Sequence, residues 1–179
     1  MPARIPQILD KSQLPPDYQA VFERVAASRG RPGGPYSILF HNPPIADQVD
    51  ALSQTLRTDS GLAPAEFTLA VARAKDCLFV WSVQAPGARR AGVSDEVIQA
   101  VGGRQTKGLN QDQADIVAYA QALVASNRVD EALFGRLRES HGVPWLVGLT
   151  TVAGHFNLIC GVNNAFAVPP SPDGDALPS

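Results

Sequence analysis

Apolar residues recur at helical spacing over most of this chain. Such stretches, separated by proline and glycine, lie at about residues 15–29, 44–60, 64–76, 77–85, 94–102, 110–124, 133–137 and 144–167. The short apolar stretch 36–41 could form a strand or a helical turn, and we favour the helix because no second strand is available for pairing. The pattern therefore predicts an all-α bundle of about seven or eight helices.

Polar residues mark where several of these helices begin. Ser94 precedes Asp95 and Glu96, which suit the first turn of a helix. Asn110 with Gln113 three residues later predicts a capping box. The helix after Pro64 is apolar on nearly all sides, so we expect it to be buried, and the apolar run that follows it meets Pro86.

Length and composition favour one domain. The 179 residues divide into an extended segment at 1–14, a helical domain at 15–168 and a proline-rich tail at 169–179, which is either an extended strap or disordered. Charged residues make up 18% of the chain, below the usual quarter or so, which indicates extra apolar surface inside the fold or between subunits. The net charge of −2 indicates no positively charged surface of the kind that binds nucleic acid, so no nucleic-acid partner is expected.

The stretch from Pro144 to Pro172 lacks acidic and basic residues and is long enough to cross a bilayer. Histidine, asparagine and threonine interrupt it, so a buried core helix is the better interpretation and no membrane partner is expected. The N-terminus has no apolar stretch of signal-peptide length, which favours the cytoplasm. There, Cys77 and Cys160 are expected as buried apolar residues, although a bridge between them stays open.

Four segments resemble one known family in the same order along the chain. They are the N-terminal helix and glycine-rich loop at 15–34, LFHNP at 39–43, FTLAVARAKDCLFVWSVQAPGARRAGVSDEV at 67–97 and NNAFAVP at 163–169, and the likeness spans about residues 15–170. This set is similar to the carboxymuconolactone decarboxylase family, within the alkylhydroperoxidase D-like superfamily. The resemblance implies an all-helical fold, assembly as a homo-oligomer (trimer or hexamer), and either thiol peroxidase or decarboxylase chemistry.

The chain departs from both chemistries at two positions. Alignment of Cys77 with the first cysteine of the family places Val80 at the second cysteine and Gln84 at the histidine. A dithiol cycle needs an attacking and a resolving thiol, so this alignment argues against a thiol peroxidase. A glutamine amide does not titrate, so Gln84 also removes the expected acid/base group.

Two residues are the candidates for moving a proton. His155 is the only side chain in its long neutral helix that titrates near neutral pH, and the alternative is a core histidine satisfied by a backbone carbonyl. Glu66 lies near the helix-borne glutamate of the family, with a spacing about one residue short. Its simpler interpretation is an acidic residue that stabilises the first turn of a helix.

The remaining candidates would bind substrate. Arg73 could hold a carboxylate or could form an internal salt bridge. Cys77, Trp81 and Gln84 share one helical face. The resemblance implies that this face lines the pocket, whereas the sequence pattern alone would place it in the core. His41 precedes Asn42-Pro43 and is either a pocket residue or a turn residue. No metal-ligand motif is present, and we expect no metal and no cofactor.

The resemblance and these residues lead to one main hypothesis. The chain is expected to be a cofactor-free lyase acting on a small carboxylated lactone or related acid from aromatic catabolism. One alternative is a catalytically inert, oligomeric binding or scaffold protein, which Val80 and Gln84 favour. Another is a different lyase or isomerase acting on a related acid with a relocated catalytic group.

Overall fold

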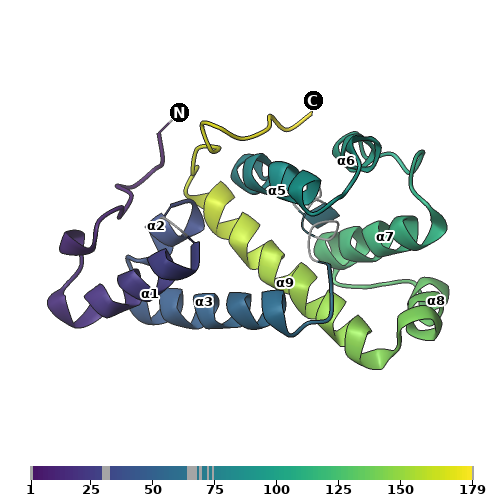
Figure 1. The fold of residues 1–179 in the computed structure, drawn as a ribbon, viewed down its shortest axis with the longest axis horizontal. Coiled ribbons are helices and arrows are strands. Elements are labelled where there is room, and N and C mark those ends of the chain that lie inside the picture. Colours follow the sequence, from purple (N-terminus) through teal and green to yellow (C-terminus); the bar gives the residue numbers. More distant parts are fainter. Residues whose placement is uncertain are drawn as a thin grey trace.

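The fold consists of helices arranged around one long central helix (Figure 1). The computed structural model describes residues 2–29, 33–63, 68, 70, 71, 73 and 75–178. Within these residues there are eight α-helices and two short 3-10 helices, and no strand. The predicted all-α class is therefore confirmed.

Helix α9 (Val143–Ala165) lies at the centre of the arrangement. It crosses the molecule between an N-terminal group of helices and a second group formed by α5 to α8 (Figure 1). Its neighbours in space are α2, α3, α5, α7 and α8. By length and composition α9 could span a membrane, and 39% of its most apolar window is buried inside the structure. The predicted core helix is therefore covered by its neighbours on one part of its surface only.

The N-terminal group comprises α1 (Gln19–Arg29), α2 (Pro35–Leu39) and α3 (Pro43–Thr58). The short apolar stretch before His41 is thus helical, as predicted. Prolines occupy the first turns of α2 and α3, where their missing N–H groups cost no intrahelical bond.

The second group comprises α5 (Leu78–Arg90), α6 (Asp95–Gly102), α7 (Gln111–Ser126) and α8 (Glu131–His141). The predicted caps are present: Ser94 accepts a hydrogen bond from the backbone N–H of Val97, and Asn110 forms a reciprocal capping box with Gln113.

The apolar run that starts at Cys77 does not end at Pro86, because α5 continues through this proline to Arg90. A proline inside a helix has no N–H for the carbonyl four residues earlier, which here belongs to Ser82. Of the helix predicted after Pro64, the described residues Thr68, Ala70 and Val71 are fully buried.

The C-terminal tail is extended along α5 (Figure 1). The backbone N–H of Ser171 donates to Ser82 Oγ at 2.8 Å, Asp175 pairs with Arg89 at 3.0 Å, and the carbonyl of Pro178 accepts from Arg73. Of the two predicted states of the tail, the structure adopts the strap.

Candidate functional site

A cavity of about 820 Å³ lies where the N-terminal helices, α5, α9 and the tail meet. The C-terminal end of α1, the start of α2 and one face of α3 form its first side. Phe79, Val80, Val83 and Gln84 of α5 form the second, and Pro169–Pro172 of the tail close a third. A cavity of this size matches the space that small-molecule sites occupy.

His155 extends from α9 into the lining of this cavity. Only 6% of the residue is exposed, and its Nδ1 has no hydrogen-bond partner within the described residues. The ring packs edge-on against Phe156, with 5.5 Å between the ring centroids. A buried polar atom without a partner is costly, so a ligand that pairs with it would recover that energy.

The electrostatic surroundings keep His155 neutral. Burial lowers its pKa to about 4, with further contributions from the positive charges of Arg29 and Arg57, while Asp50 acts in the opposite direction. At neutral pH the imidazole is therefore uncharged and can accept a proton.

Arg29 is fixed by a set of partners at the cavity wall. Its guanidinium pairs with Asp50 at 2.8 Å and donates to the hydroxyl groups of Tyr36 at 2.7 Å and Ser53 at 3.0 Å. It also stacks on the Tyr36 ring, 4.1 Å from the centroid. The charge of Arg29 is thus largely compensated within the protein.

Arg57 lines the same cavity one helical turn after Ser53 on α3. Unlike Arg29, it has no acidic partner and no hydrogen bond within the part of the chain that the structure describes. Desolvation and the nearby charge of Arg29 lower its pKa, although an arginine keeps its proton in proteins. Arg57 is nevertheless an exposed residue, so solvent partly screens its charge. The cavity therefore has, beside a neutral histidine, a positive charge without an ion-pair partner among the described residues, an arrangement suited to a carboxylate.

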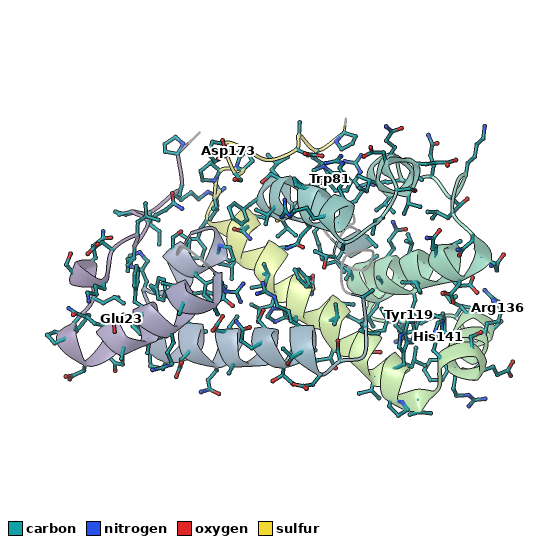
Figure 2. All side chains as sticks on the ribbon, viewed as in Figure 1. Glu23, Trp81, Tyr119, Arg136, His141 and Asp173 are labelled. Carbon is teal, nitrogen blue, oxygen red and sulfur yellow. The ribbon has the colours of Figure 1, made fainter. Side chains whose placement is uncertain are left out.

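The three candidates at the start of α5 and along it, Cys77, Trp81 and Gln84, separate into two groups. Gln84 lines the cavity, as Val80 does. Cys77 and Trp81 lie in the core, and Trp81 packs near Gly102 and Pro178 beneath the C-terminal segment (Figure 2). Only Gln84 of these three can reach a ligand in the cavity.

Arg73 and His41 do not line the cavity. Arg73 pairs with Asp76 at 3.2 Å and donates to the Pro178 carbonyl at 2.8 Å, which is the salt-bridge alternative. His41 hydrogen-bonds through Nε2 to the Pro6 carbonyl at 2.8 Å, which joins the residues before α3 to the N-terminal segment. Glu66 lies outside the described residues.

Sequence reasoning missed Arg29 and Arg57. Both lie on helices that read as ordinary amphipathic segments, and nothing local distinguishes them from surface arginines. The sequence did contain one indication of a polar site on α3. Ser53 and Arg57, four residues apart, place two polar groups on the same helical face as the apolar Val49. Among the described residues no cluster of three or more His, Cys, Asp and Glu side chains could hold a metal.

Comparison with known proteins supports the fold. No family model matches the chain, and no curated protein matches it. A peroxidase-related protein with an alkylhydroperoxidase AhpD core from Ralstonia eutropha JMP134 has a TM-score of 0.78 at 22% identity, over 96% of this chain and 93% of that one. A peroxidase-related protein from Silicibacter sp. TM1040 has a TM-score of 0.74 at 21% identity, over 94% and 93% of the two chains.

A third similar structure is the debrominase Bmp8 in complex with 2,3,4-tribromopyrrole. Its TM-score is 0.76 at 16% identity, with coverage of 94% of this chain and 92% of that one. The three similarities establish an AhpD-like helical fold for this chain. Proteins of this fold include an enzyme that binds a small ring compound.

Proposed function

We propose that the chain is a cofactor-free lyase that removes a carboxyl group from a small lactone or related ring acid of aromatic catabolism, in the cytoplasm. The observation that supports this proposal is the pairing of an unpartnered Arg57 with a neutral, buried His155 in one cavity. Arg57 takes the binding role that sequence reasoning gave to Arg73.

In this proposal the substrate carboxylate binds Arg57, and the apolar ring lies against Phe79, Phe156 and Ile159. Burial is the main cause of the lowered pKa of His155, and the two arginines add to it. The negative charge of the substrate opposes the effect of the arginines, so the pKa of the imidazole is higher in the complex than in the free protein. Binding thus makes the protonated ring, the acid that the reaction needs, more accessible.

Cleavage of the bond to the carboxyl group releases carbon dioxide and leaves its electron pair on the ring as an enolate. The positive charge of Arg57 stabilises this developing charge, and His155 donates its proton to the carbon that lost the carboxyl group. Gln84 donates or accepts a hydrogen bond and orients the ring, because its amide has no titratable proton.

The test is turnover of 4-carboxymuconolactone and a panel of related ring carboxylates, followed by carbon dioxide release. We expect His155→Gln to lower kcat by a factor of about 100 or more, in the range of lost general acid–base catalysis. The matched control is His41→Gln, which alters a histidine outside the cavity and should keep wild-type activity.

Other outcomes select among the alternatives. Product formation without carbon dioxide would favour a different lyase or an isomerase. Saturable binding without turnover would favour the inert binding protein, an alternative that agrees with the lack of a titratable proton at Gln84. Wild-type protein that is folded and neither binds nor converts any carboxylate would exclude the proposal.

A further inference from the structure

The charge in the cavity comes from one side only. Of the described residues that line it, Arg29 and Arg57 alone carry a charge at neutral pH, and both belong to the N-terminal helices. Tyr36 and Ser53 add hydroxyl groups on the same side and accept hydrogen bonds from Arg29. Neither α5 nor the tail contributes a charged side chain to this lining. The described lining therefore stabilises an anionic group on the side of α1 and α3.

The sides of the cavity formed by α5 and the tail are apolar. Phe79 and Val83 of α5 line the cavity, and so does the segment Pro169–Pro172 of the tail. Three of these four tail residues are prolines, which have no backbone N–H to donate. The fourth, Ser171, donates its N–H to Ser82 Oγ. This part of the tail therefore offers a ligand apolar surface and no free backbone N–H.

Phe79 extends this apolar surface from α5 to the start of α2. Its ring lies against Gly34, where an added Cβ would collide with it and where the φ of +55° favours glycine. Phe156 and Ile159 of α9 continue the apolar lining. Gln84 is the one polar side chain that α5 contributes, and its amide can hydrogen-bond a carbonyl but cannot neutralise an anion.

The cavity is also larger than a single small ring requires. Its volume of about 820 Å³ lies in the upper part of the range of drug-sized ligand sites, roughly 300–1,000 Å³. A small ring acid held at Arg57 by its carboxylate would leave apolar wall uncovered. Burial of further apolar surface would stabilise the complex.

We propose that the ligand of this cavity is a ring monocarboxylate that carries an apolar alkyl or aryl substituent. This inference rests on the proposed function for the carboxylate at Arg57 and names the class of ring acid that the site takes. The substituent lies against Phe79, Val83 and the prolines of the tail. A second carboxylate on that side would lose hydration and find no cation in the described lining, so the site favours monocarboxylates over dicarboxylates.

Isothermal titration calorimetry at pH 7 tests this with the full-length protein and benzoate, 4-ethylbenzoate and 4-butylbenzoate. We expect the dissociation constant to fall about three- to fourfold for each added methylene, as burial of that group predicts. Terephthalate and 4-isopropylbenzoate have similar shapes and differ in the charge of the second substituent. Terephthalate should therefore bind more weakly than 4-isopropylbenzoate, by about tenfold or more.

A variant on α5 tests where the substituent lies. Val83→Asp places a carboxylate in the apolar lining and should weaken binding of 4-butylbenzoate about tenfold or more, with a smaller effect on benzoate. Leu78→Asp is the matched control, because Leu78 is exposed on the same helix and does not line the cavity. It should leave both affinities unchanged. An equal loss for both acids in Val83→Asp would contradict this placement.

The outcomes separate this inference from the proposed lyase. Equal affinities along the alkyl series, terephthalate binding as tight as that of 4-isopropylbenzoate, or no binding of any benzoate would overturn the inference, and carbon dioxide release would still test the lyase. Affinities that rise along the series without turnover of any ring acid would support the ligand class and contradict the lyase. Arg57→Gln should weaken every member of the series by a similar factor, about tenfold. Unchanged affinities in Arg57→Gln would overturn the binding of the carboxylate on which the inference rests.

Discussion

At the scale of single residues, the two arginines that line the cavity differ in their interaction partners. Arg29 forms an ion pair with Asp50 and donates hydrogen bonds to two hydroxyl groups, whereas Arg57 has no such partner within the described residues. Removal of one member of a buried ion pair leaves the other charge uncompensated and costs stability. Arg57 can be changed without that cost, so it is the residue at which binding can be tested apart from folding.

Arg57→Gln should raise the pKa of His155 in the free protein, because one of the positive charges that lower it is removed. We expect a higher pKa than in the wild-type protein, with both measured by NMR titration of the imidazole. Arg24→Gln is the matched control, since Arg24 pairs with Asp47 on the surface and does not line the cavity. A His155 pKa that stays unchanged in Arg57→Gln would contradict the proximity of the two charges.

His155 should also make the protein sensitive to acid. Its pKa is about 4 in the folded state and about 6.5 when unfolded, so the unfolded state binds the extra proton first. Stability is therefore full above pH 6.5 and falls as the pH drops towards 4, by roughly 3 kcal/mol in total.

Urea unfolding between pH 7 and pH 4 measures this loss, with His155→Gln as the reference that lacks it. The pKa of Asp115 is lowered, first by the hydrogen bond from Arg136, so its contribution to stability is lost from about pH 5 downward. The His155→Gln reference shares this loss, so the difference between the two proteins isolates His155. Parallel curves for the two proteins would contradict a buried, neutral His155.

How far the site could be predicted from the sequence differs by residue. His155 stood out because its helix has no other group that titrates near neutral pH, and that property is local. Arg57 and Arg73 look equivalent in the sequence, since both follow apolar helical positions. Only the packing of α3 against α9, and of the tail against Arg73, decides which guanidinium faces the cavity.

At the scale of elements, the tail packs closely against α5 near Pro86, the proline inside that helix. Pro86 leaves the carbonyl of Ser82 without an intrahelical donor, and the tail passes over it with Gly174 in contact with that carbonyl. The caps at Ser94 and Asn110 were predictable because their partners lie within four residues. The passage of α5 through Pro86 was not, because it depends on a segment far along the chain.

Gly174→Ala should loosen the strap, because an added Cβ would collide with the backbone of Ser82. We expect faster hydrogen exchange at the Ser171 amide, which donates to Ser82 Oγ, together with a lower melting temperature. Gly154→Ala is the control: its Cβ meets no atom and it lies inside α9, so alanine should stabilise the protein by about 0.5–1 kcal/mol. Equal exchange at Ser171 in both variants would contradict the close fit.

At the scale of the whole molecule, α9 is more apolar than its own packing requires. Only 39% of its most apolar window is buried, and Val143, Val147 and Leu158 remain 58%, 59% and 45% exposed. Val143 and Val147 also line a shallow apolar groove with Phe134 of α8. A monomer rarely exposes such an apolar surface to solvent. The low share of charged residues also indicates apolar surface buried between subunits.

We propose that a second copy of this chain covers this face of α9, in a homo-oligomer such as a trimer or hexamer. Light scattering after size exclusion should then give a mass that is a multiple of 19.0 kDa. Val147→Asp should shift this mass towards the monomer, because a carboxylate at a desolvated contact has no partner. Leu52→Asp on α3 tests whether any charge at an exposed apolar residue has the same effect, and it should leave the mass unchanged. A wild-type protein that is monomeric at micromolar concentration would contradict the proposal.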